Sequence, residues 1–387
     1  MHDCHREIAR WVEPLGVKTR IDAAGNLRGV YPAAQPHAPR FLIGSHLDTV
    51  PNAGAYDGIL GVVLAVVLLE ELKGRKLPFA IEVLGFSEEE GVRFGTPFIG
   101  SRALVGRLDQ QLLDVRDSLG ISVRNAIEDF GLDPKMIPQA ELGDDTLGYL
   151  EFHIDQGPVL EKLNQPIAAV EAIAGQSRLE FTFSGRANHA GTTPMHLRCD
   201  ALAGAAEWIG TVERLAKEIP GLAATVGRIE VRPGVANVIA AEAQLTLDIR
   251  HSSDDVRTRA AGDLIHGAQE ISARRGLVVR ESTLLNQRAV AMEPFLIGQI
   301  ENAIAMTGCK PHRMVSGAGH DAMIMAEKVP SAMIFLRTPG GISHDPAESV
   351  AVEDVEKAIQ CGLHLLDQLA ASVQFTNARV LPKDKSE

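Results

Sequence analysis

Short apolar runs alternate with a helical pattern early in the chain, and this alternation limits the possible folds more than any other feature. Residues 41–45 (FLIGS) and 79–86 (FAIEVLGF) have the length and apolar character of buried strands. Residues 58–73 lie between them and have the pattern of a buried helix. Strand–helix–strand alternation predicts a mostly parallel sheet with helices on both faces, so the expected fold class is α/β.

Segments nearer the C-terminus have the same character. Residues 330–336 (PSAMIFL) predict another buried strand, and residues 350–371 predict a long closing helix. Residues 104–131 are expected to be helical with a turn near Gly120. The polar segment after Thr376 is expected to fray.

The middle of the chain follows a different pattern. Residues 177–184 (SRLEFTFS) alternate apolar and polar side chains, which is typical of a half-buried antiparallel strand. A helix, two strands, a helix and a strand are expected to follow at residues 199–217, 224–231, 243–251, 254–274 and 277–282. This β-α-β-β-α-β order predicts a ferredoxin-like α+β domain inserted into the larger one. The expected boundaries are 1–174 and 289–387 for the larger domain and 175–288 for the inserted one.

Length and charge exclude several classes of function. A chain of 387 residues is expected to hold two domains. Its formal net charge is −12 and Lys and Arg form no cluster, which argues against a nucleic-acid partner. The longest apolar run, residues 59–69, is too short to span a bilayer, and residues 1–11 are too polar for a signal peptide. The four cysteines form no CxxC pair. We expect a soluble cytoplasmic protein with no membrane partner.

Metal-ligand residue types follow the first predicted strand. His46, in GSHLDTV (44–50), occupies the position at which open α/β sheets place their ligands. Asp48 could accept the imidazole N–H of His46 and set its tautomer. The alternative interpretation is that this segment is only a polar turn after a strand, without a metal. Asp57 directly precedes the helical pattern, so it is either the N-cap of that helix or a carboxylate that bridges two cations.

Three consecutive acids, Glu88 to Glu90, end the second predicted strand. A solvated charge run is the ordinary interpretation of such a series, but like charges at the end of a buried strand are costly without a cation. Neighbouring strand residues point to opposite faces, so Glu89 and Glu90 reach one site only if the chain turns, which Gly91 permits. One carboxylate would then bind metal, and the other would act as general base on a water.

Two further histidines complete a mixed nitrogen and oxygen ligand set. His153 lies in EFHIDQG (151–157) and His344 lies in GISHDP (341–346). A lone histidine is more often structural, so the prediction depends on the whole set. Imidazole together with carboxylate favours two divalent ions among zinc, manganese, cobalt and nickel. Such a pair, about 3.5–4 Å apart, would share a bridging carboxylate and a water.

Taken together, these motifs resemble those of the di-zinc aminoacylase and carboxypeptidase family of metallopeptidases. The resemblance is to its amidase/carbamoylase branch, which holds N-carbamoyl-L-amino acid hydrolases, allantoate amidohydrolases and ureidoglycolate amidohydrolases. The similar segments span nearly the whole chain: GSHLDTV (44–50), YDGILGV (56–62), FSEEEGVRF (86–94), FHIDQGPVLE (152–161), NHAGTTPM (188–195), GAGHDA (317–322) and GISHDPAES (341–349). The resemblance implies a phosphorylase/hydrolase-like catalytic domain, an inserted lid and dimerisation domain, and hence a homodimer.

The resemblance also implies a role for each matched residue near the metals. His46 and His153 would each bind one metal with Asp57 as the bridge, and Glu90 and His344 would complete the second metal. Glu89 would be the general base, and Asp48 would orient His46.

Further matched residues would contact a small substrate that carries a carboxylate. His189 would stabilise the developing oxyanion, in the partner subunit's site. Arg250 would hold the substrate carboxylate as a bidentate fork. The other implied substrate-binding residues are Gln156, Asn237 and Gly319. The chain departs from the family at Asp155, where relatives have Glu, and at residues 237–241 (NVIAA), which lack the Pro-Gly common after that Asn.

We therefore expect a two-metal hydrolase that cleaves a non-peptide C–N bond in an N-carbamoyl-L-amino acid or a ureido acid such as allantoate, with release of ammonia. One alternative is a dipeptidase or aminoacylase on the same scaffold. Another is a metal-free binding or scaffold protein. Loss of the metal-ligand residues would identify such a protein. No GxGxxG follows a first strand, and this excludes a Rossmann-type dehydrogenase. The motifs fit ureido and carbamoyl substrates equally well.

Overall fold

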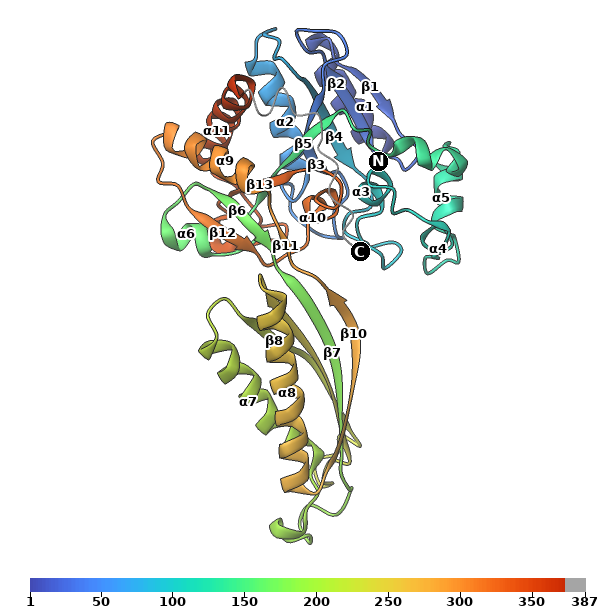
Figure 1. The fold of residues 1–387 in the computed structure, drawn as a ribbon. Helices are drawn as coiled ribbons and strands as arrows, with labels where there is room; N and C mark the ends of the chain where they lie inside the picture. The colour runs from blue at the N-terminus through green and yellow to red at the C-terminus, as the bar shows by residue number, and fades with distance from the viewer. Residues whose placement is uncertain (373–387) are drawn as a thin grey trace, which may run out of the picture. The chain divides into compact units, whose positions relative to one another are not determined.

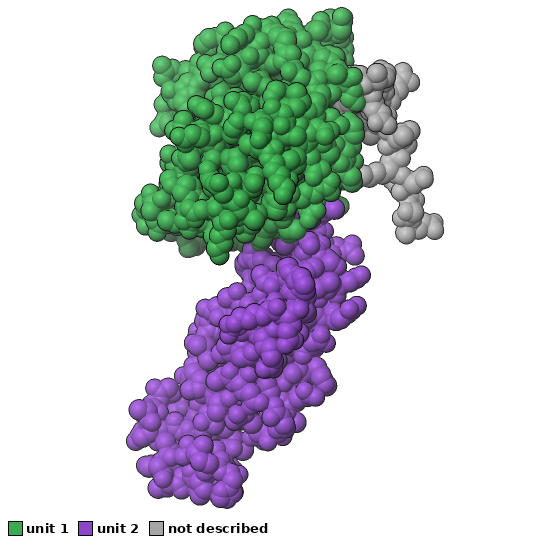
Figure 2. Space-filling model, turned by 90° about the vertical axis from the view of Figure 1, so that its left-hand side faces the viewer, with its two compact units in different colours: residues 1–171, 292–387 green, residues 172–291 purple. Residues whose placement is uncertain are grey.

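The computed structural model describes residues 1–372, and the segment after Thr376 lies outside this range. The chain forms two compact units, shown in different colours in Figure 2. Unit 1 comprises Met1–Glu171 and Met292–Glu387, and unit 2 comprises Ala172–Ala291. Within residues 1–372, no helix combines the length and the apolar character needed to cross a membrane.

Unit 1 contains most of a large sheet whose strands run in the order β1-β2-β4-β3-β5-β13-β6-β11, with β12 paired to β6. Strand β11 and the last two residues of β6 fall within the residue range of unit 2. The central strands β4, β3, β5 and β13 are parallel to one another, while β1, β2, β6 and β11 pair antiparallel at the two sides. This confirms the predicted α/β class with a parallel centre. The strands are β1 (Lys18–Ile21), β2 (Leu27–Tyr31), β3 (Arg40–His46), β4 (Ala80–Phe86), β5 (Thr146–Ile154), β6 (Ile167–Ile173), β11 (Val290–Ala291), β12 (Arg313–Ser316) and β13 (Ser331–Leu336).

Every residue of β4, β5 and β13 is buried, which shows that both faces of the sheet centre are covered. Helix α2 packs on β3 and β5, and α11 packs on both α2 and α9 (Figure 1). The helices of this unit are α1 (His2–Val12), α2 (Ile59–Glu71), α3 (Ile99–Leu104), α4 (Gln110–Leu113), α5 (Val123–Asp129), α6 (Val159–Leu163), α9 (Pro294–Met306), α10 (Asp321–Met325) and α11 (Val352–Ala371). Short 3₁₀ turns lie at Glu13–Leu15, Pro134–Ala140 and Pro339–Gly341.

The turn predicted near Gly120 is present, since the Gly120 N–H donates to the Asp117 carbonyl at 3.0 Å, but the helix predicted over residues 104–131 is not continuous on either side of it. Only the short helices α4 and α5 form there. The Asp117 carboxylate accepts hydrogen bonds from the backbone N–H groups of Leu119 and Ile121, at 3.0 and 2.9 Å. Ser122 caps α5 by accepting from Asn125 N–H at 3.1 Å. Such side-chain bonds to the local backbone compete with a continuous helix, so the segment breaks around residues 117–122.

Unit 2 has the element order β7-α7-β8-β9-α8-β10, and its antiparallel sheet runs β10-β7-β9-β8 (Figure 1). Alternate residues of β7 and β9 are buried, as the sequence pattern predicts for a sheet with one covered face. Trp208 of α7 is fully buried against this face and donates to the Leu264 carbonyl of α8 at 2.9 Å. The elements are β7 (Gly175–Ser184), α7 (Ala201–Glu218), β8 (Ala223–Arg232), β9 (Glu242–His251), α8 (Asp254–Arg275) and β10 (Val278–Gln287), with a 3₁₀ turn at Met195–Leu197.

Two arginines share one buried carboxylate in the sheet of unit 1. Glu82 of β4 is fully buried and accepts from Arg28 Nε at 2.6 Å and from an Arg40 terminal nitrogen at 2.8 Å. Glu82→Gln would leave the buried Arg28 guanidinium without its counter-ion. We expect a loss of about 3–5 kcal/mol in the free energy of unfolding, measured by urea denaturation. Glu356→Gln, on the exposed side of α11, is the control, and a loss as small as that of the control would contradict the prediction.

Candidate metal centre

The predicted ligands come from the carboxyl ends of neighbouring strands. His46 is the last residue of β3, and His153 is the last residue but one of β5. Glu89 and Glu90 follow the end of β4, and His344 follows β13 at a longer interval. Because β4, β3, β5 and β13 are parallel, their carboxyl ends meet at one edge of the sheet.

Asp57 lies between three imidazoles. Its Oδ1 atom is 3.0 Å from His153 Nε2 and 3.5 Å from His46 Nε2, and its Oδ2 atom is 3.0 Å from His344 Nε2. Asp57 does not cap helix α2, whose N-cap is Gly58 and has no side-chain cap bond. A Cβ at Gly58 would lie 2.4 Å from the His46 ring, so only glycine lets the ring pack beneath the start of α2. The geometry therefore favours the bridging role over the N-cap role.

The candidate ligand atoms form three groups. One group holds two histidines, His46 and His153, on one side of Asp57. We expected His46 and His153 to serve different metals. Their Nε2 atoms lie 3.4 Å apart and both face the same oxygen of Asp57, so the geometry makes them candidate ligands of one ion. The groups are His46, Asp57 and His153; His46, Glu89 and Glu90; and Asp57, Glu90 and His344.

Glu90 and His344 lie on the other side of Asp57. The nearest atoms of the pair, Glu90 Oε1 and His344 Nε2, are 3.7 Å apart. Among the described residues, Glu90 Oε1 is buried without a hydrogen-bond partner. A buried carboxylate oxygen is costly in this state, and a divalent cation held by Asp57, Glu90 and His344 would satisfy it. The residues present therefore fit a metal ion at this place.

Backbone carbonyl groups orient two of the imidazoles. The Asp48 carbonyl lies 2.8 Å from His46 Nδ1, and the Ile154 carbonyl lies 2.9 Å from His153 Nδ1. Each carbonyl accepts the Nδ1 proton and leaves Nε2 for a metal. The prediction that the Asp48 side chain orients His46 is corrected in this respect, because its carboxylate is 3.9 Å from Nδ1.

The Asp48 carboxylate instead holds the turn that carries the two glutamates. It accepts from the backbone N–H groups of Glu89 and Glu90 at 3.0 and 3.1 Å. The chain turns here as predicted, with positive φ angles of 55° at Glu88 and 65° at Gly91. This turn brings both Glu89 and Glu90 within reach of His46.

Burial and charge together set the protonation of the site. Burial raises the pKa of Glu89 well above its usual range, His46 opposes this, and Asp321 and Glu90 add to it. Burial favours a neutral His46, but Glu89 and Asp57 outweigh it and raise the His46 pKa. Burial would also raise the pKa of Asp57, yet hydrogen bonds from His153 and His46 hold it far below the usual range. The raised pKa makes the Glu89 carboxylate a stronger base than a solvent-exposed carboxylate.

Three further residues surround Asp57, and two of them are absent from the predicted site. Gln156, expected to bind substrate, donates from its amide to Asp57 Oδ2 at 3.0 Å. The Ser343 hydroxyl lies 3.3 Å from the same oxygen. Glu348 accepts from the Asp57 backbone N–H at 3.1 Å. The sequence contained a signal for Ser343 and Glu348, because both belong to GISHDPAES (341–349) together with His344.

Asp155 and Gly319, two other predicted positions of unit 1, make structural contacts. Asp155, the departure from the family, accepts from the N–H groups of Thr338 and Leu160 at 3.0 and 3.2 Å, and so links the end of β5 to the chain after β13. Gly319 precedes α10, and a Cβ there would lie 2.9 Å from the Phe98 ring.

The remaining predicted substrate contacts belong to unit 2. His189 is exposed, and its Nδ1 atom accepts from the N–H groups of Gly191 and Thr192 at 3.1 and 3.2 Å. A β-bridge joins His189 to Val238, which brings the exposed Asn237 beside it. Arg250 of β9 forms a two-point ion pair with Asp248, at 2.8 and 3.2 Å.

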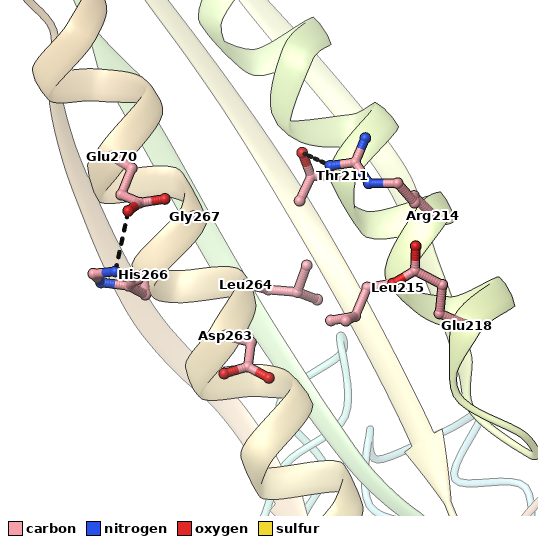
Figure 3. A pocket seen from close by; sticks show the side chains of 9 residues that line it. All are labelled: Thr211, Arg214, Leu215, Glu218, Asp263, Leu264, His266, Gly267 and Glu270. Carbon is pink, nitrogen blue, oxygen red and sulfur yellow. Dashed lines mark hydrogen bonds and ion pairs between the residues drawn. The ribbon is translucent and has the colours of Figure 1, made fainter.

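A groove of about 250 Å³ lies between α7 and α8 of unit 2 (Figure 3). Leu215 and Leu264 face each other across it, and charged side chains such as Arg214 and Asp263 surround them. None of the three metal-ligand groups found within residues 1–372 includes a residue of this groove. The candidate metal centre is therefore a separate site, built from unit 1.

Comparison with known proteins identifies the family. Residues 42–368 match the model described as Peptidase family M20/M25/M40. The chain is 38% identical over 371 residues to the N-carbamoyl-L-amino acid amidohydrolase of Geobacillus stearothermophilus, covering 94% of this chain and 90% of that protein. It is 38% identical over 400 residues to an allantoate deiminase of Arabidopsis thaliana, covering 95% and 76%. The chain thus belongs to peptidase family M20/M25/M40, which confirms the resemblance seen in the motifs.

A solved structure supports the same assignment at the level of the fold. The hydantoinase/carbamoylase family amidase from Burkholderia multivorans has a TM-score of 0.90 with this chain at 31% sequence identity. The match covers 95% of this chain and 90% of that one.

Proposed function

We propose that the protein is a divalent-metal-dependent hydrolase that cleaves a non-peptide C–N bond in an N-carbamoyl-L-amino acid or a ureido acid such as allantoate. The observation that carries this proposal is the position of Asp57 between three imidazoles, with the buried Glu89 in a neighbouring turn. The choice of bond is supported by the 38% identity to an N-carbamoyl-L-amino acid amidohydrolase and an allantoate deiminase.

The residues divide into ligands and a general base. Two divalent ions would be held by two sets that share Asp57: His46, Asp57 and His153, and Asp57, Glu90 and His344. When bound, the ions would supply a water that is acidic enough to react at neutral pH. Glu89 takes the proton of the attacking water and later returns it to the departing nitrogen. A carbamoyl substrate would yield an amino acid, ammonia and carbon dioxide.

The proposal includes contacts from unit 2. His189 would stabilise the developing oxyanion, Asn237 would hydrogen-bond the substrate, and Arg250 would bind its carboxylate. These roles, and a lid and dimerisation function for residues 172–291, rest on the sequence resemblance. In unit 1, Gln156 and Gly319 would complete the substrate contacts, and Gln156 would have to release Asp57 to do so.

An ammonia-release assay with the metal-stripped and reconstituted protein tests the function. The substrates would be N-carbamoyl-L-amino acids, allantoate, ureidoglycolate and a set of dipeptides, each with Mn²⁺, Zn²⁺ or Co²⁺. We expect ammonia from at least one carbamoyl or ureido acid, loss of activity when a chelator is added, and recovery when the metal is restored, because the ions activate the water.

Two outcomes would contradict the proposal. Cleavage of dipeptides without release of ammonia from any carbamoyl or ureido acid would assign the protein to a peptidase activity. Ammonia release that persists unchanged in the chelated protein would exclude the metal-dependent mechanism.

A further inference from the structure

Glu348 is a buried carboxylate that joins two distant segments of unit 1. One carboxylate oxygen accepts from the backbone N–H groups of Tyr56 and Asp57, at 2.9 and 3.1 Å. The other accepts from the Ser343 hydroxyl at 3.3 Å. The residue is only 5% exposed, although nothing in its charge favours burial. A buried ionised group is retained only where several donors satisfy it, and here three do.

Both segments are shaped to receive this carboxylate. Gly54 lies directly against it, and a Cβ on Gly54 would be 2.3 Å from Glu348 Cβ and 2.4 Å from a carboxylate oxygen. Any larger residue at position 54 would therefore displace the side chain. On the other side, Glu348 N–H donates to the Asp345 carbonyl at 2.9 Å, which closes a turn directly after His344.

The two segments also carry ligands of the same metal group. Asp57 Oδ2 is 3.0 Å from His344 Nε2, and these residues share a group with Glu90. His344 is 47% exposed and has a φ angle of 57°, in the left-handed region. A non-glycine residue stays in this region only when its neighbours hold it there. Among the described contacts, those of Glu348 hold the His344 turn to the backbone of Asp57.

We propose that Glu348 is a positioning residue that sets the separation of Asp57 and His344 and thereby controls occupancy of the second metal position. It does not contact substrate or metal itself. The inference rests on the proposed two-metal function, because it concerns the position formed by Asp57, Glu90 and His344. The position formed by His46, Asp57 and His153 shares Asp57, but its two histidines lie on β3 and β5, which Glu348 does not contact, so it depends less on Glu348.

The hydroxyl proton of Ser343 provides a second connection between Glu348 and Asp57. The hydroxyl lies 3.3 Å from both Asp57 Oδ2 and Glu348 Oε2, and it can donate to only one of them at a time. When a cation occupies Asp57 Oδ2, the hydroxyl donates to Glu348 instead. Glu348 thus supplies the alternative acceptor that frees the Asp57 oxygen for metal.

Metal titration of defined variants tests the role of Glu348. The stripped protein would be titrated with Zn²⁺ by calorimetry, and bound zinc would be counted by mass spectrometry. We expect two sites in the wild-type protein. Glu348→Ala and Glu348→Asp should weaken one site by about 10- to 100-fold, as loss of a partner that orients ligands does, and leave the other nearly unchanged. Glu348→Gln should weaken the same site less than Glu348→Ala and Glu348→Asp do, since its amide oxygen still accepts from the two N–H groups although its NH₂ group cannot accept from Ser343.

Kinetics provide a readout that a general structural role would not change. For Glu348→Asp, the metal concentration that gives half-maximal ammonia release should rise in parallel with the weakened site. The kcat at saturating metal should return close to that of the wild-type protein. Glu356→Ala, on the exposed side of α11, removes a carboxylate elsewhere and should change neither quantity.

Several results would overturn the inference. Two tight sites in both Glu348→Ala and Glu348→Asp would show that the carboxylate does not position the ligands. Equal weakening of both sites would show a general structural role. If Glu348→Ala fails to fold, the comparison of Glu348→Asp with Glu348→Gln decides the matter. A wild-type protein that binds fewer than two ions would contradict the proposed function, whereas retained metal without ammonia release would concern the substrate alone.

Discussion

Glu89→Gln is expected to lower kcat by about 10²- to 10⁴-fold while the metal ions remain bound, because general acid–base catalysis contributes an effect of this size. Glutamine has nearly the shape of glutamate but cannot accept a proton from water and return it to a leaving nitrogen. The side chain is only 6% exposed, so bulk solvent cannot readily replace it. The kcat for ammonia release and the metal content of the same preparation should be measured together.

Glu88→Gln is the matched control for this experiment. It removes the same charge from the adjacent residue, and none of the three metal-ligand groups includes Glu88. We expect activity close to that of the wild-type protein. Full activity in Glu89→Gln would show that another group is the base, and loss of metal from that variant would show that Glu89 is a ligand.

Asp57→Asn is expected to have the second large effect, a loss of both metal binding and activity. Asp57 belongs to two of the three metal-ligand groups, and a neutral amide cannot bridge two cations as a carboxylate does. Metal ions contribute several kcal/mol of transition-state stabilisation, which corresponds to about 10³-fold or more in rate. Metal stoichiometry by mass spectrometry and ammonia release would measure the two losses.

Asp144→Asn is a suitable control for the Asp57 variant, since Asp144 is exposed and lies outside the metal-ligand groups. It should bind as many ions as the wild-type protein. If Asp57→Asn also bound two ions per chain with unchanged affinity, Asp57 would not be the bridge. The pair of variants therefore separates the effect of the bridging position from that of a lost negative charge.

The elements best predicted from the sequence are those whose burial is uniform or strictly alternating. The strands β3 and β4 and the helix α2 lie within two residues of the segments expected from apolar runs. The first two strands, β1 and β2, were not anticipated. Arg28 in β2 is buried against Glu82, and a charged residue that is buried by an ion pair gives no apolar signal. The ion pair with Glu82, which lies 54 residues further along the chain, accounts for the burial of Arg28, and the local sequence pattern does not indicate it.

The sequence alone determined which side chains would meet at the metal centre. Their chemistry identifies them as ligands, and parallel strands bring their carboxyl ends to one edge of the sheet regardless of the details of packing. For this reason His46, His153 and the pair Glu89 and Glu90 could be named from short motifs at predicted strand ends, whereas the choice of Glu90 as the ligand came from the family resemblance. The acid at position 57 had two local interpretations, and the motif itself did not choose between them.

Only the tertiary structure decided how these groups face one another. Asp57 bridges the imidazoles instead of capping α2, because Gly58 starts the helix and Glu348, 291 residues further along the chain, holds the Asp57 backbone. The Asp48 carboxylate binds the Glu89 and Glu90 backbone rather than His46, because the turn after β4 brings those N–H groups closer. Such hydrogen bonds depend on the packed positions of distant segments, and no local sequence pattern encodes them.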